Sequence, residues 1–108
     1  MELTGKQKTF LRGRGQLLDP VVHVGKEGVS AECVSVTLDA FRTRELLKVR
    51  VLKTAPAALP EVATQLAEQT ASYMTGKVGY TFLLYKPNPD LRNRLEFPVK
   101  ATEESEDE

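Results

Sequence analysis

Apolar and polar residues alternate along the chain with two different periods, which predicts both strands and helices. The clearest strand is "RELLKVRVLKT" at residues 44–54, where apolar residues alternate with basic ones. The apolar positions are Leu47, Val49 and Val51, and the positions between them are Lys48 and Arg50. One face of this strand should therefore pack against a core, while the other presents positive charge.

Three more strands are expected. "VVHV" at residues 21–24 is a short β-branched run typical of buried strands, and we interpret His23 within it as a packed or edge residue. Downstream, Gly76 and Gly79 separate apolar runs, which predicts two strands joined by a tight turn. The second of these strands is "TFLLY" at residues 81–85.

The N-terminal segment carries a complete start signal for a helix. Thr4 can cap the helix, Gln7 can complete a capping box, and Leu3 stands where a hydrophobic staple requires an apolar residue. The two glycines of "RGRGQ" predict that this helix ends at about Gly13.

Two further helices are predicted. The apolar residues of "SAECVSVTLDAF", residues 30–41, fit the spacing of a strand and of a helix, and Ser30 with Glu32 in the first turn favours the helix. Cys33 then lies on the buried face as an inert thiol. The third helix begins near Pro60 and carries apolar residues at helical spacing.

The elements follow in the order helix, strand, helix, strand, helix, strand, strand. This order predicts a layered α/β (α+β) fold with a four-stranded mixed sheet. The 108 residues fit one domain, for which we expect the bounds 1–88. An extension at 89–102 and an acidic, disordered tail at 103–108 should follow it.

Composition excludes several classes of protein. With one cysteine and one histidine, the chain can form neither an internal disulfide nor the common Cys/His metal clusters. No apolar run reaches the length of about 18 residues that a membrane span needs, and the charged N-terminus is unlike a signal peptide. We therefore expect a cytoplasmic protein with no membrane partner.

The formal net charge of zero hides an asymmetry. Five of the 15 acidic residues lie in the last six positions, whereas all 15 basic residues lie between Lys6 and Lys100. Residues 1–102 therefore carry 15 basic against 10 acidic residues, a net charge of +5. A mildly basic domain favours an anionic partner. The tail could compete with that partner for the basic surface, or simply keep the protein in solution.

Motifs that would indicate catalysis are missing. The sequence has no phosphate-binding loop of an NTPase, no nucleophile elbow, and no histidine beside a cysteine or serine in a known pattern. The acidic residues before the tail are explained by helix caps and surface charge. We expect neither enzymatic activity nor a cofactor.

The segment "GKEG", Gly25 to Gly28, joins a predicted strand to the helix capped by Ser30. Glycines at both ends let the backbone adopt conformations closed to other residues and leave no side chain to hold a ligand away. The helix N-terminus adds unpaired N–H groups, and Lys26 adds a full positive charge. By themselves these four residues favour an ordinary turn, although they also suit a loop that binds a phosphate backbone.

Three blocks of sequence resemble a known family. They are "LTGKQKTFLRGRGQLLDPVVHVGKEGVS" at 3–30, "RELLKVRVL" at 44–52 and "GYTFLLYKP" at 79–87. In their order and spacing they resemble the YhbY-like family of small bacterial RNA-binding proteins, whose unit is the CRM domain. The resemblance covers most of residues 3–87.

This resemblance implies a fold and a binding site. The fold is a compact domain of three main helices against a four-stranded mixed sheet, KH-like and similar to the C-terminal domain of bacterial initiation factor 3. The RNA contact is a GXXG loop. The loop falls on Gly25, Lys26, Glu27 and Gly28, and the family's basic first helix falls on Lys6, Lys8, Arg12 and Arg14.

The resemblance also implies a partner. Single-domain bacterial members are associated with precursors of the large ribosomal subunit, so we expect a non-catalytic monomer that binds ribosomal RNA in such precursors. Lys48 and Arg50 would add charge if the fold brings them near the loop. A second hypothesis is a regulatory or scaffolding α/β domain that binds a protein or metabolite, in which case GKEG is only a turn.

Two residues depart from the family pattern. Thr70 is followed by Ala71 where members commonly have glycine, so the third helix is expected to end differently. Glu27 places a carboxylate inside the proposed loop, and the direction of that side chain decides how well the loop can hold a phosphate.

Overall fold

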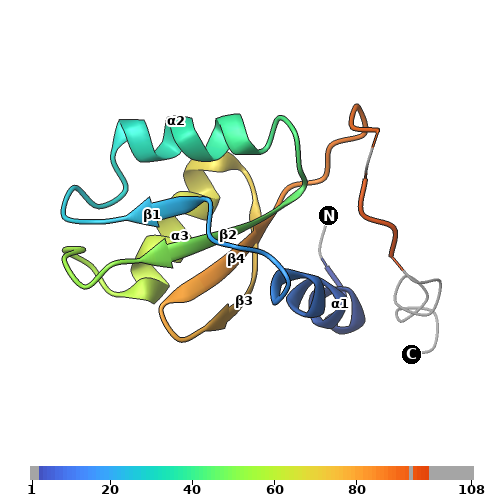
Figure 1. The fold of residues 1–108 in the computed structure, drawn as a ribbon, viewed down its shortest axis with the longest axis horizontal. Coiled ribbons are helices and arrows are strands. Elements are labelled where there is room, and N and C mark those ends of the chain that lie inside the picture. Colours follow the sequence, from blue (N-terminus) through green and yellow to red (C-terminus); the bar gives the residue numbers. More distant parts are fainter. Residues whose placement is uncertain (1–2, 93, 98–108) are drawn as a thin grey trace.

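The strands of the chain are β1 (Val22–Val24), β2 (Leu46–Val51), β3 (Tyr73–Val78) and β4 (Thr81–Tyr85). In the computed structural model, which describes residues 3–92 and 94–97, they form one sheet in the order β1-β2-β4-β3 (Figure 1). β1 runs parallel to β2, and the other neighbours are antiparallel. The two strands in which most residues are buried and which have a neighbour on both sides, β2 and β4, thus occupy the middle of a mixed sheet, and the predicted fold class is confirmed.

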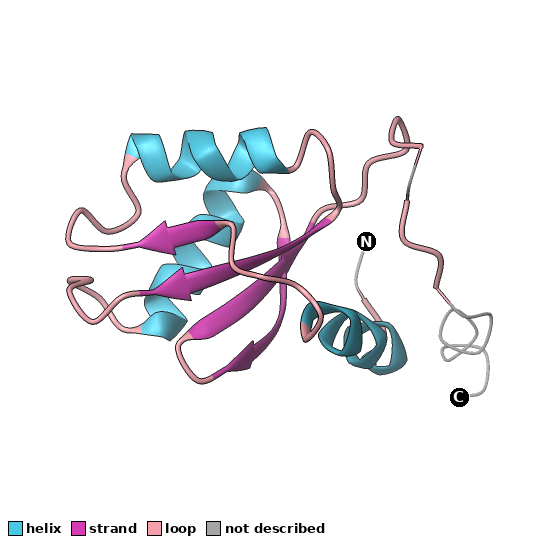
Figure 2. Ribbon diagram, in the orientation of Figure 1, coloured by secondary structure: helices cyan, strands magenta, loops and turns pink. Residues whose placement is uncertain are grey.

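One face of the sheet is covered by two helices, α2 (Ala31–Ala40) and α3 (Leu59–Thr70), as Figure 2 shows. The main core lies between these helices and alternate residues of the strands. Its buried members are Val22, Val24, Phe41, Leu47, Val49, Val51, Val62, Ala63, Leu66, Phe82 and Leu84. The predicted inward face of residues 44–54 is therefore confirmed, and it is this core that fixes the register of β2.

The opposite face of the sheet is only partly covered, by α1 (Gly5–Gly15). Leu11 of this helix is fully buried in a second cluster with Leu46, Leu83 and Tyr85. Gly15 lies so close to β4 that a Cβ atom there would collide with the side chain of Leu83. The helix therefore continues two residues beyond its predicted end at Gly13, because this contact outweighs the weak helix propensity of glycine.

Several local predictions are confirmed. Thr4 and Gln7 form the capping box: the Thr4 N–H donates to Gln7 Oε1 with an N to O distance of 2.9 Å, and the Gln7 N–H donates to Thr4 Oγ1 at 3.1 Å. At the start of α2, Ser30 Oγ accepts a hydrogen bond from the Cys33 N–H at 3.1 Å. His23 is an exposed residue of the edge strand β1. The β3–β4 turn contains Gly79, whereas Gly76 lies inside β3 at an irregularity of the register. In the described part of the chain, every helix is too short or too polar to cross a membrane.

The C-terminal segment returns to the body of the domain through one buried carboxylate, that of Glu45. Its oxygens accept hydrogen bonds from the backbone N–H groups of Asn88 at 2.7 Å and Leu95 at 2.8 Å, and from Arg94 Nε at 3.1 Å. Phe97 then packs on the rings of Phe10 and Tyr85. The first part of the expected extension is thus attached beside α1, whereas residues 98–102 and the expected tail lie outside the described residues.

Replacing Glu45 should test this attachment. We expect Glu45→Ala to lower the free energy of unfolding by about 2–4 kcal/mol, because two backbone N–H groups and a guanidinium lose a charged acceptor. Asp39→Ala is the matched control, since it removes the carboxylate of an exposed ion pair with Arg42 and should cost less than about 1 kcal/mol. Urea denaturation measures both, and equal effects would contradict the assignment.

The third helix ends with Ala71 in the left-handed conformation, with φ of 54° and ψ of 47°. The N–H of Ser72 donates to the carbonyl of Ala67 at 2.9 Å, which closes the helix end in the usual glycine-terminated way. The departure from the family pattern therefore places an alanine in a conformation that glycine usually adopts. Alanine is strained in this region because its Cβ approaches the carbonyl oxygen.

Ala71→Gly should consequently stabilise the protein. We expect the free energy of unfolding to rise by about 1 kcal/mol, since glycine adopts this conformation without the strain. Ala67→Gly, inside α3, is the control and should lower the same quantity by about 1 kcal/mol. A loss of stability in both variants, measured by denaturant titration, would show that Ala71 is not strained.

Candidate functional site

A tight turn joins β1 to α2 at residues 25–28. The N–H of Gly28 donates to the carbonyl of Gly25 at 2.9 Å, so Lys26 and Glu27 form the two exposed corners. Gly28 has a φ of 65°, whereas Gly25 lies outside the left-handed region. The expectation that both glycines serve an unusual conformation is therefore correct only for Gly28.

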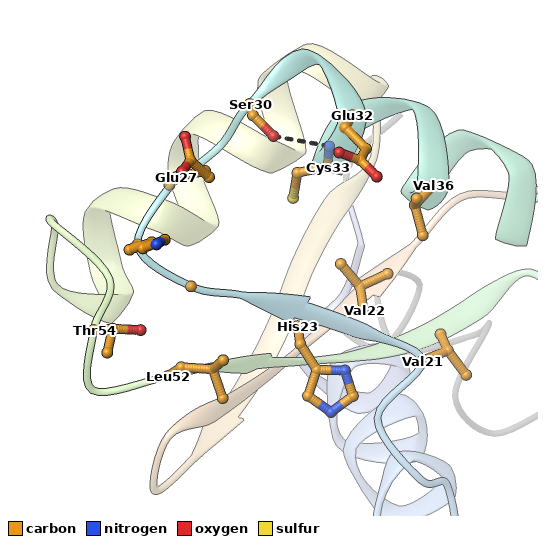
Figure 3. Close-up of a pocket in the computed structure, with 13 residues that line it drawn as sticks. Val21, Val22, His23, Glu27, Ser30, Glu32, Cys33, Val36, Leu52 and Thr54 are labelled. Carbon is orange, nitrogen blue, oxygen red and sulfur yellow. Dashed lines mark hydrogen bonds between the residues drawn. The ribbon is translucent and has the colours of Figure 1, made fainter.

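The turn closes one end of a groove of about 590 Å³ that runs between the free edge of β1 and helix α2 (Figure 3). Its lining is contributed by the strand, the turn, the first turns of the helix and the segment after β2. The lining residues are Val21, Val22, His23, Gly25, Lys26, Glu27, Gly28, Ser30, Glu32, Cys33, Val36, Leu52 and Thr54. The groove thus has an apolar middle and a polar end.

Backbone N–H groups without a protein acceptor gather at the polar end of the groove. Across residues 3–92 and 94–97, no carbonyl or side chain accepts from the amides of Lys26 and Glu27, or from those of Ala31 and Glu32 in the first turn of α2. Ser30 satisfies the next amide, that of Cys33. Such groups, together with the partial positive charge of a helix N-terminus, favour an anion.

The charges of the side chains around this groove are mixed. Lys26 is opposed by Glu27 and Glu32, so the ionisable side chains that line the groove sum to −1 with His23 neutral. In Figure 3 the carboxylate of Glu27 extends away from β1 and from His23. The side chain therefore extends away from the strand side of the groove, although its charge still opposes an anion.

Cys33 lines the groove but has no features of a nucleophile. Burial raises the pKa of its thiol above the ordinary value, and a hydrogen bond with Thr37 lowers it by less. The sulfur therefore remains protonated at neutral pH, and it is the thiolate that reacts. Within the described residues there is also no group of three His, Cys, Asp or Glu side chains placed to hold a metal ion.

The structure separates the predicted basic residues into several groups. Lys6, Lys8, Arg12 and Arg14 are all exposed on α1, but Lys8, Arg12 and Arg14 border three different hollows. Lys48 and Arg50 lie on the sheet face that α1 partly covers. Figure 1 shows the 25–28 turn at the opposite end of β1 from α1, so turn and first helix do not form one surface.

Two of these residues are brought together. Arg12 and Lys48 line one groove, and Lys77, which the sequence did not indicate, lines it as well. The signal for Lys77 was absent because it lies between Gly76 and Gly79, in the segment that separates two apolar runs, where nothing relates it to a helix more than 60 residues earlier.

Comparisons with known proteins agree with this fold. A model of the CRS1 / YhbY (CRM) domain matches residues 3–86. The chain is 36% identical over 96 residues to the probable RNA-binding protein YqeI of Bacillus subtilis, covering 89% of this chain and 99% of that protein. A probable RNA-binding protein of Methanocaldococcus jannaschii is 34% identical over 87% of this chain and 71% of its own length.

A solved structure is similar as well. The solution structure of the hypothetical protein SAV1595 from Staphylococcus aureus superposes with a TM-score of 0.76 at 32% sequence identity, covering 90% of this chain and all of that one. The likeness therefore extends over nine-tenths of this chain.

Proposed function

Because the chain belongs to the CRS1/YhbY (CRM) domain family, we propose that it binds RNA without catalysing a reaction. The observation that carries this proposal is the 25–28 turn, whose unpaired amides meet those of the α2 N-terminus at the end of an open groove. The partner that we propose is ribosomal RNA in precursors of the large ribosomal subunit, bound by a cytoplasmic monomer. The CRM-type domain is proposed to span residues 1–88.

The turn would hold one phosphate of the RNA backbone. Within the described residues the amides of Lys26 and Glu27 have no protein acceptor and would donate to the phosphate, Gly25 and Gly28 carry no side chain beside them, and the Lys26 ammonium would neutralise the phosphate charge. Backbone donors of this kind contact phosphate oxygens whatever the base sequence. The turn is therefore a positioning device for the RNA.

The groove beside the turn would hold the adjoining nucleotide. Its walls include the apolar side chains of Val36 and Leu52, which are 45% and 38% exposed and offer a surface to a base. Val22 and Val24 pair with β2, and main-chain N–H and C=O groups alternate in direction along a strand. The main-chain groups of His23, between them, therefore face the free edge of the sheet. An unpaired base could bond to these groups, which favours single-stranded RNA or an exposed loop of a folded RNA.

Basic side chains outside the groove would supply most of the attraction. The proposed set is Lys6, Lys8, Arg12 and Arg14 on α1 and Lys48 and Arg50 on β2. Their contacts would be with phosphates and would depend on shape rather than on base sequence. Tyr85 is buried and Tyr73 half-buried, and Tyr80, which is 63% exposed, stands alone among the tyrosines in being exposed, so a row of base-stacking platforms is not expected on this protein.

RNA binding should depend steeply on salt. We expect the logarithm of the association constant to fall linearly with the logarithm of salt concentration, with a slope of about −0.7 for each phosphate contacted. Fluorescence anisotropy with labelled fragments of ribosomal RNA measures this slope. Binding that is absent at every salt concentration would contradict the proposal and favour a protein or metabolite as the partner.

A charge placed in the turn should weaken this binding. Gly25→Asp puts a carboxylate beside the proposed phosphate, at a position where a Cβ atom comes no closer than 3.4 Å to Leu52 and the backbone is unstrained. We expect RNA affinity to fall by at most roughly fivefold, because two unit charges 4 Å apart in water repel each other by about 1 kcal/mol. Gly25→Asn has the same shape without the charge and is the control; equal affinities of the two variants would contradict a phosphate at the turn.

Removing the carboxylate of Glu27 should have the opposite effect. Glu27→Gln keeps the size of the side chain and should raise RNA affinity by roughly two- to fivefold, the scale of an exposed charge pair. Glu68→Gln makes the same charge change at an exposed position of α3 away from the groove, and it should leave affinity nearly unchanged. If both variants respond alike, only the net charge matters and the turn has no special part.

A further inference from the structure

A second groove lies on the sheet face that α1 leaves partly open. It has a volume of about 360 Å³ and lies between the C-terminal half of α1 and strands β2, β4 and β3. Its lining residues are Arg12, Gly15, Gln16, Lys48, Lys77, Val78, Thr81, Phe82 and Leu83. None of these residues belongs to the groove at the 25–28 turn, so the two grooves are separate.

The strand register places the floor of this groove. Lys48 of β2, Leu83 of β4 and Gly76 of β3 are successive partners and form a row across the sheet, on the face opposite the main core. Neighbouring strands are about 4.8 Å apart, so Lys48 and Gly76 stand about 10 Å from each other. Arg50 is the next residue of β2 on this face, one row away, and is paired with Thr81.

Arg12 lies across Gly76 at the other end of the row. A Cβ atom at Gly76 would collide with Cγ and Cδ of Arg12, so the aliphatic part of the arginine rests directly on β3. Arg12 Nη2 donates to Thr9 Oγ1 at 3.1 Å, a hydrogen bond that holds the guanidinium but leaves its positive charge uncompensated. The absent side chain of Gly76 therefore positions a cation over the sheet.

The charge around this groove is of one sign. Its ionisable residues are Arg12, Lys48 and Lys77, and no Asp or Glu lines it. None of the three takes part in an ion pair with another residue described by the structure. Lys77 pairs with Phe82, so its side chain leaves the backbone on the opposite face of the sheet from Gly76. Because β3 is an edge strand, the charge of Lys77 lies at the rim of the groove. The groove at the turn, in contrast, has one lysine against two glutamates.

We propose that this second groove is a further phosphate-binding site for RNA, formed by Arg12, Lys48 and Lys77 and positioned by Gly76. This rests on the proposed RNA-binding function. Arg12 and Lys48 contact phosphates from the two ends of the row, and Lys77 attracts the strand as it leaves the sheet. Because the two grooves share no residue, each holds the RNA when the other is disabled.

The test combines a charge change with a change of shape. Arg12→Gln with Lys48→Gln should reduce the salt slope for a fluorescein-labelled single-stranded RNA by about 1.4, the contribution of two phosphates, and lower affinity several-fold. The same reduction is expected in the Gly25→Asp background. Arg42→Gln with Arg92→Gln removes equal charge from exposed positions outside this groove and should leave the slope nearly unchanged.

Gly76→Ala tests the geometry with the charge kept. The new methyl group displaces Arg12, so affinity should fall by about threefold, or about 0.65 kcal/mol, while circular dichroism and thermal unfolding remain those of a folded protein. Unchanged RNA affinity in this variant would overturn the positioning role of Gly76.

The outcomes separate the two proposals. If the unmodified protein binds no RNA, the proposed function fails. If it binds RNA and the Arg12/Lys48 variant matches the Arg42/Arg92 control, or loses affinity only when the turn is intact, the second site is overturned and the proposed function stands. A competition experiment on the Gly25→Asp variant compares polyglutamate with unlabelled RNA. If polyglutamate displaces the labelled RNA equally well, the second groove is not a site for RNA phosphates and the proposal is overturned.

Discussion

The structure depends on one constraint, which is that three helices have to cover two faces of a single four-stranded sheet. Helices α2 and α3 pack side by side on one face and bury alternate apolar residues of β1, β2 and β4, whereas β3 contributes no residue to this core. A single helix remains for the other face, and it reaches only the part where Leu46, Leu83 and Tyr85 provide apolar contacts. The remainder of that face carries Lys48 and Arg50, and the alternation of β2 follows directly from this division.

The same constraint places the turn. β1 has only three residues and a neighbour on one side, so its second edge is open and the chain must turn back at once to lay α2 over the core. A tight turn directly before a helix puts unpaired amides from both elements at one place. Ser30 satisfies one of them, at Cys33, whereas those ahead of it, at Ala31 and Glu32, have no acceptor among the described residues. The gathering of amides without a protein acceptor at residues 25–32 is thus a consequence of how the core is covered.

Local signals were sufficient to predict the order of elements, the caps and the mixed sheet. They acted through residues within one turn of each other, such as Thr4 with Gln7 or Ser30 with Cys33. Two of the wrong predictions concern contacts between distant segments: α1 passes Gly13 because Gly15 meets Leu83, and Gly76 lies against Arg12 rather than in the hairpin turn. Glu45 gave no signal either, because its partners are 43 to 50 residues away. The conformation of Ala71 shows the reverse case, in which the fold imposes a backbone geometry that the residue disfavours.

The two grooves differ in what they can contribute to holding RNA. Backbone amides at the turn are directional and carry no net charge, and two glutamates beside them reduce the long-range attraction of Lys26. The second groove, beside α1, has three cations and no carboxylate, so its attraction for a polyanion extends about a Debye length, roughly 8 Å at physiological salt. Attraction at a distance and orientation at contact therefore belong to different surfaces. A polyanion drawn to the open sheet face can reach the turn across Arg50 and His23, which are partners in the register of β1 and β2 and join the two surfaces. Under the two proposals a carboxylate at the turn is tolerable, because the turn would have to orient only a strand that the sheet face already holds.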